Sequence, residues 1–314
     1  MNVCIKSEQM PLSSRYKIFF NILIYVSLGF LVLYLVKSDF IDFSDFSFNY
    51  TYLIISLLLL YSGFLVSPLA WQKILRKHDI VISYRKALVS EGLPIFSKYI
   101  PGKIMIIIGR AAYISSEGGD SLVKSSSISL KAQMLSLLAA LSLGLFSFLF
   151  LKGLFIYLIL CLLAVILMMS VLFIRGIHAF FINLLRKLPG SSFTLPYVGI
   201  KESVSAFVYY LLLWGLWGAA FVIFCFSLEG ELNFLAISIF PLATALGIVA
   251  IIFPGGIGIR EGALAFLLIH AGIPADLAAI ISVGSRFWYL SGEVFIFLSS
   301  IILRGNHLFS CNRE

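Results

Sequence analysis

The sequence predicts an all-α protein, a polytopic bundle of transmembrane helices in which two helices are broken and re-entrant and belong to inverted repeats. Of its residues, 61% are hydrophobic and 12% are charged, and the mean hydropathy is +1.04. A chain of this composition lacks the polar residues needed to cover a water-facing surface. Apolar runs of roughly 20 residues recur, the length that a helix needs to cross about 30 Å of hydrocarbon. Two apolar regions are also interrupted by Pro-Gly in similar surroundings.

Six segments are predicted to cross the membrane. They cover about residues 18–36, 50–70, 128–151, 154–174, 203–228 and 276–303. The first is expected to be an anchor, because its apolar run exceeds the roughly 7–15 residues of a cleaved signal peptide and no A-x-A-type site follows it. The stretch 234–253 is a further candidate, which either crosses outright or descends to an apex at Pro254.

These segments predict one transmembrane domain over residues 1–314. Its inverted halves are expected at about 50–151 and 203–303, with short cytoplasmic tails at 1–17 and 304–314. The two halves would carry one broken helix each.

The distribution of lysine and arginine predicts the orientation. Most cations fall in the N-terminal tail, in the connections that follow the second and fourth spans, and in the C-terminal tail. Because the basic side is normally cytoplasmic, we expect a multi-pass protein of the cell (inner) membrane with its N-terminus and C-terminus in the cytoplasm. The net charge of +8 reflects this bias, and the sequence shows no soluble basic domain, so nucleic acid is not an expected partner.

The residue patterns of common enzyme chemistry are missing from the sequence. The four cysteines are scattered without a CxxC, the four histidines form no i, i+4 pair, and no Walker loop occurs. We therefore expect no enzymatic activity, no metal site and no cofactor.

Several ionisable residues fall within apolar segments, namely Lys103, Arg110, Lys131, Arg260, Glu261, Arg286 and Glu293. A charge at the bilayer centre costs about 2.5–3.5 kcal/mol on insertion scales, so such residues usually face a bundle interior or a watery cavity. Lys131 lies early in its span and is expected to snorkel to the headgroups. Arg286 and Glu293 are seven positions apart and share a helix face, where they either lock that helix to a neighbour or contact a substrate.

Two stretches, KYIPGKIMIIIGR at 98–110 and FPGGIGIREG at 253–262, place Pro-Gly ahead of a cation in apolar surroundings. Proline removes a backbone donor and clashes with the preceding turn, and glycine permits the torsions of a chain reversal. Each Pro-Gly therefore predicts an apex between two half-helices. The arm that enters the first apex is expected to lie partly on the membrane surface, with the charged residues Arg85, Lys86, Glu91 and Lys98.

Broken backbone at membrane depth is tolerated only where protein or water satisfies its polar groups. Interruptions at corresponding positions of two halves are typical of inverted-repeat transporters, whose site lies near the midplane. The helix that follows each apex would point a partly positive N-terminus with free N–H groups inward, and this end can hold an anion. A phosphate or another anionic headgroup fits this arrangement. The alternative is that two prolines kink ordinary helices whose cations snorkel.

At these motifs the chain resembles the lysylphosphatidylglycerol synthase transmembrane-region family, over about residues 90 to 300. The resemblance rests on YIPGK…GR, on FPGGIGIREG and on the late span with Arg286 and Glu293. That family includes the flippase part of the lysyl-lipid synthase and stand-alone proteins of glycan and lipid pathways. The resemblance implies re-entrant helices and, for some members, movement of a charged or glycosylated lipid between leaflets. It also implies the candidate site residues Pro101, Gly102, Lys103, Arg110, Pro254, Gly255, Gly256, Arg260 and Glu261.

The chain departs from this family at two points. The soluble aminoacyl-transferring domain of the full synthase is missing, so lysine transfer to lipid is not expected. Lys131 stands where relatives often carry an acidic residue early in the third full span, so the substrate of the best-known member is not carried over.

We therefore expect an integral membrane protein that binds and translocates an anionic lipid or a polyprenyl-phosphate-linked glycan between leaflets. The alternative is a non-transporting membrane partner that tethers or assists a glycosyltransferase or a lipid-modifying enzyme. A tether would tolerate a neutral residue at Arg260, whereas a translocator would not. The sequence leaves the substrate, the direction and energy source of transport and the oligomeric state open.

Two structural details follow from the second motif. Neighbouring helical positions point about 100° apart, so Arg260 is expected to face the central cavity while Glu261 pairs with Arg286 on another element. Gly258 and Gly262 form a G-x-x-x-G spacing, which allows close backbone approach in membranes. They are expected to pack against the last span near Gly284 and Gly292.

Overall fold

The computed structural model describes residues 49–99, 104–118, 121–151, 153–186, 197, 199–250, 256 and 258–304. The predicted span at 18–36 and the tail residues 1–17 and 305–314 lie outside this part of the chain. So do the two Pro-Gly pairs, at Pro101 and Pro254.

Every regular element in the described part is helical. The first half contains α2 (Tyr50–Arg76), α3 (Tyr84–Gly92), η2 (Ile95–Tyr99), α4 (Ile104–Gly118), α5 (Leu122–Gly144) and η3 (Leu145–Leu149). Next come α6 (Phe155–Phe173) and α7 (Arg175–Arg186). The second half contains α8 (Ile200–Ser227), η4 (Phe234–Ser238), α9 (Ile239–Val249), α10 (Ile259–His270) and α11 (Ala275–Arg304). The all-α prediction is confirmed.

Five of these helices are long and apolar enough to cross a membrane. They are α2, α5 with η3, α6, α8 and α11, and they coincide with the predicted spans that lie in the described residues. Two boundaries differ by six residues: α2 ends at Arg76 rather than near residue 70, and α5 begins at Leu122 rather than near residue 128. Ser121 caps this helix by accepting a hydrogen bond from the Lys124 N–H, which explains the earlier start.

The candidate span 234–253 is divided. Its first five residues form η4, and the α-helical part, α9, has 11 residues. At 1.5 Å per residue this helix is only about 16 Å long, roughly half of the hydrocarbon thickness. The α-helical part is therefore too short to cross the membrane by itself, and both interpretations of this segment, a full crossing and half of a re-entrant hairpin, stay open.

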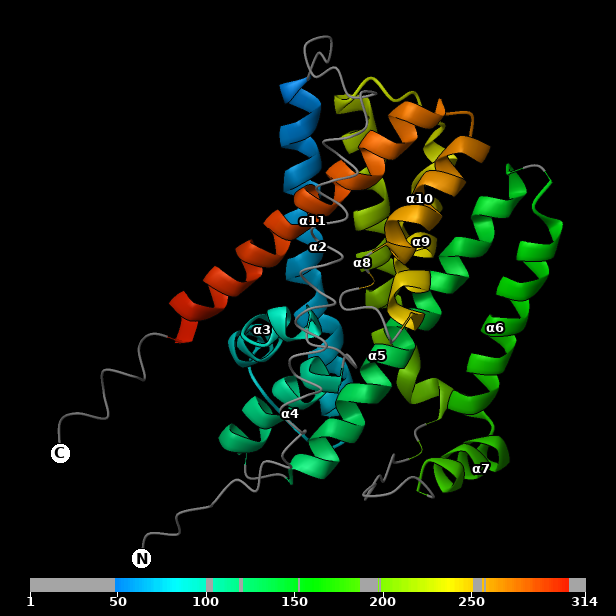
Figure 1. Cartoon of the computed structure of the whole chain (residues 1–314). Helices are drawn as coiled ribbons and strands as arrows, with labels where there is room; N and C mark the ends of the chain where they lie inside the picture. Colours follow the sequence, from blue (N-terminus) through cyan, green and yellow to red (C-terminus); the bar gives the residue numbers. More distant parts are fainter. Residues whose placement is uncertain are drawn as a thin grey trace, which may run out of the picture. The chain divides into compact units, whose positions relative to one another are not determined.

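The two halves repeat one order of elements: a long helix, a pair of short helices and a second long helix. Figure 1 shows α3 and α4 near one end of the long helices, and α9 and α10 nearer the other end. The inverted relation of the two halves stays a prediction. Re-entry of the short helices into a membrane stays a prediction.

The halves meet where α2 packs along α8. A side chain at Gly63 would overlap the Trp217 ring, and one at Gly218 would overlap the Ile237 carbonyl oxygen. The Ser56 hydroxyl donates to the Ala220 carbonyl at 2.8 Å. Small residues at these positions therefore bring the backbones of α2, α8 and η4 close together, as is typical of helix packing in membranes.

The expected packing of Gly258 and Gly262 is wrong. A Cβ at either position would have no other atom within 4 Å, because Gly262 lies on the exposed face of α10 and Gly258 precedes the helix with φ 85°. The close approach at α11 involves Gly292, where a side chain would overlap the ring of Phe64 on α2.

Candidate functional site

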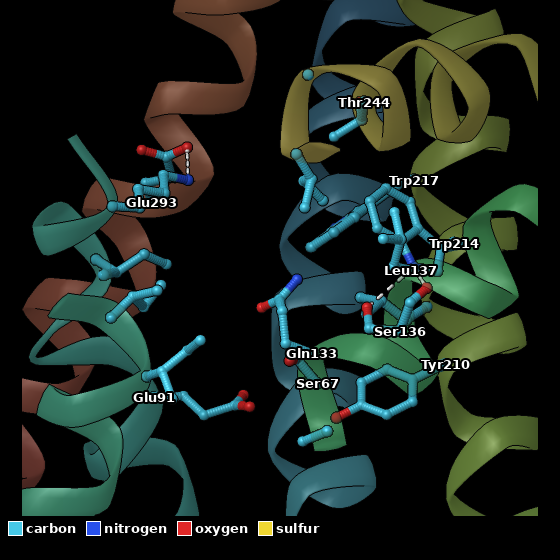
Figure 2. Close-up of a pocket in the computed structure, with 18 of the residues that line it drawn as sticks. Ser67, Glu91, Gln133, Ser136, Leu137, Tyr210, Trp214, Trp217, Thr244 and Glu293 are labelled. Atoms are coloured by element: carbon cyan, nitrogen blue, oxygen red, sulfur yellow. Dashed lines mark hydrogen bonds and ion pairs between the residues drawn. The ribbon is translucent and has the colours of Figure 1, made fainter. Parts of the chain in front are cut away.

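A central cavity of about 470 Å³ lies between the short-helix pairs and the long helices. This volume is within the range of roughly 300–1,000 Å³ that is usual for ligand pockets. Figure 2 shows residues from α3, α5, α8, α9 and α11 around it. Most of its lining is apolar, and the polar side chains fall into the groups described below.

Arg260 is placed in the cavity wall by the close approach of α9 and α10. A Cβ at Gly247 would lie 2.9 Å from the Arg260 Cβ, so glycine is needed for this contact. Gly256, which has φ 71°, lies against Gly247 as well, because a Cβ there would be 2.7 Å from the Gly247 carbonyl oxygen. Only 3% of Arg260 is exposed, and its side chain lines the cavity as predicted.

Aromatic rings hold the Arg260 guanidinium. Its Cζ lies 5.0 Å from the ring centroid of Phe240 and 5.1 Å from that of Tyr289, and Nη2 donates to the Ser285 hydroxyl at 3.4 Å. Among the described residues, no carboxylate lies within 4.0 Å of it, and Nε has no hydrogen-bond partner. Arg260 is therefore a buried cation whose contacts are neutral.

Glu261 pairs with α11. Its Oε1 lies 3.5 Å from Nη1 of Arg286, and its Oε2 accepts a hydrogen bond from the Gly258 N–H at 2.8 Å. The second contact caps the start of α10. The predicted Glu261–Arg286 pair is confirmed.

Glu293, also on α11, binds η2 of the first half. The Lys98 ammonium forms an ion pair with it, and the Tyr99 hydroxyl donates to its Oε2 at 2.8 Å. The Cζ of Arg286 lies 5.2 Å from the Tyr99 ring centroid. Contacts between charged and aromatic groups therefore run from α10 through α11 to η2.

A further ion pair lies on the wall formed by α3 and α4. Arg110 Nη2 is 3.2 Å from Glu91 Oε1, and the guanidinium lies 5.3 Å from the ring centroid of Trp71. Tyr210 of α8 lines the same part of the cavity and is 2% exposed.

The predicted site residues thus come together only in part. The residues Arg110, Arg260, Arg286 and Glu293 line one cavity, and Glu261 lies beside it. Gly256 is buried at the turn before α10. The remaining candidates, Pro101, Gly102, Lys103, Pro254 and Gly255, lie outside the described residues.

Two expectations about charged residues are wrong. Lys131 is 2% exposed and does not snorkel, because the earlier start of α5 places it well inside that helix. Glu91 was assigned to a surface arm, yet only 5% of it is exposed. Arg85 of the same arm is exposed and donates from Nε to the Leu303 carbonyl at 2.8 Å, and its place at the membrane surface stays a prediction.

Three residues of the site are not indicated by the sequence patterns above: Glu91, Lys98 and Tyr99. Lys98 and Tyr99 are the first two residues of the stretch KYIPGK, which contains the first Pro-Gly, and this position is the signal that could have identified them. Lys98 was grouped with the basic connection because lysine is common there.

The charges of the site are nearly balanced. Lys98, Arg110 and Arg286 each pair with one of Glu293, Glu91 and Glu261. Arg260 is the additional cation, so these seven residues carry a formal charge of +1.

Comparison with known proteins gives one match. A family model described as "Lysylphosphatidylglycerol synthase TM region" matches residues 18–292. No curated protein and no solved structure matches the chain.

Proposed function

The chain belongs to the lysylphosphatidylglycerol synthase transmembrane-region family, and from this premise we propose that it binds an anionic lipid headgroup in the central cavity and carries it between leaflets. The family and the five apolar helices support a membrane protein with a lipid-related role. The main observation in support of headgroup binding is Arg260, a buried guanidinium without a carboxylate partner among the described residues.

A buried and unpaired cation is unfavourable, because the desolvation of an ion costs several kcal/mol unless another charge offsets it. A phosphate group in the cavity would supply that charge. The planar guanidinium presents paired N–H donors that match two phosphate oxygens, and it lies against the rings of Phe240 and Tyr289. Arg260 is thus oriented for an oxyanion before any ligand arrives.

Translocation, rather than static binding, is supported by the way both halves contribute to the cavity. Lys98 of η2 and Arg110 of α4 come from the first half, whereas Arg260 of α10 comes from the second. In inverted-repeat transporters, access alternates as one repeat moves against the other around a fixed site. The Lys98–Glu293 contact is one that such a movement would break and restore.

Such translocation makes and breaks no covalent bond. The cavity residues hold, orient and release the headgroup, and the acyl or isoprenoid chain stays in the bilayer. A polyprenyl-phosphate-linked glycan meets the same requirement as an anionic phospholipid, since both carry a phosphate next to an apolar chain.

The alternative from another class is a membrane partner that tethers or assists a glycosyltransferase or a lipid-modifying enzyme. One observation favours it. In α6 only 17% of an 18-residue apolar segment is buried, whereas the corresponding share is 33–50% in the other four spanning helices. An outward-facing apolar helix can contact either lipid or a second membrane protein.

Reconstitution separates the two. The purified chain would be placed in liposomes with acyl-labelled fluorescent phosphatidylglycerol or phosphatidylcholine, and a membrane-impermeant reductant would bleach the outer leaflet. If the chain translocates anionic lipid, labelled phosphatidylglycerol of the inner leaflet should move outward and be bleached by the reductant faster than labelled phosphatidylcholine. Protection equal to that in protein-free liposomes for both lipids would contradict transport and favour the partner role.

A further inference from the structure

Figure 2 shows Glu91 of α3 and Tyr210 of α8 on opposite walls of the cavity, with the Glu91 carboxylate and the Tyr210 hydroxyl directed toward each other. Ser67 of α2 and Gln133 of α5 lie between these walls. Glu293, which belongs to the charged group around Arg260, lies elsewhere on the lining. The Glu91–Tyr210 region is therefore a second polar part of the same cavity.

The polar atoms here are buried and incompletely bonded. The Tyr210 hydroxyl belongs to a residue that is 2% exposed, and it makes no hydrogen bond with another described residue. Glu91 is 5% exposed, and its Oε1 faces Arg110 at 3.2 Å without hydrogen-bond geometry. Because a buried polar group without a partner is costly, these atoms are suited to bind polar groups of a ligand.

The charge balance indicates which polar groups fit. Glu91 and Arg110 compensate each other, and Tyr210, Gln133 and Ser67 are uncharged at neutral pH. A second phosphate would need an uncompensated cation here, and an ammonium group would need an uncompensated carboxylate. Hydroxyl groups need neither, since each donates one hydrogen bond and accepts others. The mixture of acceptors and donors in this region matches several neighbouring hydroxyls.

The adjoining wall is aromatic and rigid. Trp214 donates from Nε1 to the Ser136 carbonyl oxygen at 2.9 Å, and its ring centroid lies 5.1 Å from that of Trp217. The Arg110 guanidinium is fixed over Trp71. The C–H side of a polyol can pack against such rings while its hydroxyls face the polar wall.

We propose that Tyr210, Gln133 and the Glu91–Arg110 pair form a second subsite that binds vicinal hydroxyls next to the ligand's phosphate. This inference rests on the proposed function, in which Arg260 binds the phosphate. The shared chemistry is an anionic lipid with a polyol headgroup, which is either a glycerol or a ring such as a sugar. Headgroups with the same phosphodiester charge but without hydroxyls should bind more weakly.

Binding can be measured through the tryptophans of the cavity wall. The chain would be placed in phosphatidylcholine nanodiscs, and the change in tryptophan fluorescence would be followed as one of three lipids of equal charge is added. Phosphatidylmethanol has no headgroup hydroxyl, phosphatidylglycerol has two, and phosphatidylinositol has a ring polyol. We expect phosphatidylglycerol or phosphatidylinositol to bind about tenfold more tightly than phosphatidylmethanol, and the tighter of the two identifies the glycerol or the ring as the better fit.

Tyr210→Phe removes the hydroxyl alone, and Tyr209→Phe on the same helix is the matched control, because Tyr209 does not line the cavity. Tyr210→Phe should lower the affinity for the polyol lipids by about threefold to tenfold and leave the affinity for phosphatidylmethanol unchanged. Tyr209→Phe should change neither affinity. An equal loss of affinity for all three lipids in Tyr210→Phe would show that Tyr210 has a structural role and would overturn the proposed subsite.

Arg260→Gln separates the two proposals. Equal affinity of the wild-type chain for all three lipids, with a loss of that affinity in Arg260→Gln, would overturn the polyol subsite and leave the phosphate site standing. If none of the three lipids binds, both the polyol subsite and the phosphate site are overturned.

Discussion

The Glu261 carboxylate lies 3.5 Å from the Arg286 guanidinium, while Arg260, the residue directly before it in the chain, turns into the central cavity. Adjacent residues with opposite charges thus have different partners. Glu261 holds α10 to α11, and this contact leaves Arg260 available to a ligand.

The first prediction concerns that ion pair. Arg286→Gln leaves the largely buried Glu261 carboxylate without its cation, which should lower the stability by about 1–3 kcal/mol. The melting temperature in detergent measures this. The double variant Glu261→Gln/Arg286→Gln should recover part of the loss, since no uncompensated charge remains. Additive losses in the double-mutant cycle would show that the two side chains do not interact.

A second prediction compares two glycines. Gly218→Ala should destabilise the protein by about 1–3 kcal/mol, because the added methyl group overlaps the Ile237 carbonyl oxygen. Gly262→Ala should be neutral or stabilise α10 by about 0.5–1 kcal/mol, because the added methyl group meets open space. Thermal unfolding of both variants against the wild type measures this, and a larger loss for Gly262→Ala would contradict the packing described above.

The third prediction is a pH dependence. Burial, followed by the nearby charges of Lys131 and Lys124, lowers the pKa of His78 from its ordinary value of 6.5 to about 4. The folded state therefore keeps His78 neutral while the unfolded state binds a proton, so stability is lost as pH falls from about 6.5 to about 4. The melting temperature should fall less steeply between pH 7 and 5 in His78→Gln. His270→Gln is the control, because His270 is exposed and its Nδ1 bonds the Phe266 carbonyl of its own helix. Equal slopes for wild type and His78→Gln would refute this assignment.

The fourth prediction concerns topology. The C-terminal end of α2 and the N-terminal ends of α5, α7 and α8 lie at the same end of the bundle in Figure 1, and α11 ends toward that side as well. Because these connections carry the cations, we expect this end and the C-terminus in the cytoplasm. A C-terminal reporter that is active only in the periplasm should stay silent. A strong signal would place the C-terminus outside and remove the inverted-repeat interpretation.

The spanning helices can be predicted from the sequence because the pattern that indicates them is local. Each spanning helix needs about 20 apolar residues in one run, and such runs are visible without tertiary information. The direction of Arg260 and the Glu261–Arg286 pair were also predictable, because helix geometry separates adjacent side chains by about 100° and Arg286 was the cation expected nearest.

The missed features depend on contacts between distant parts of the chain. Glu91 and Lys98 belong to a polar and basic stretch that is typical of a surface connection. The packing of α3 and η2 against α11 accompanies the burial of Glu91 and covers Lys98 in part. Gly262 had the spacing of a packing motif, but which face of α10 meets α11 is decided by the other contacts of that helix. Lys131 was misplaced because the start of α5 depends on the Ser121 cap.

The most direct test of the central claim is leaflet-resolved transport by Arg260→Gln in proteoliposomes. Arg76→Gln is the matched control, since it removes the same charge from an exposed residue at the end of α2. We predict that Arg260→Gln remains inserted and folded but moves the anionic lipid at least about 30-fold more slowly, while Arg76→Gln transports at the wild-type rate. Equal transport by Arg260→Gln and wild type would contradict the claim that this buried cation binds the substrate.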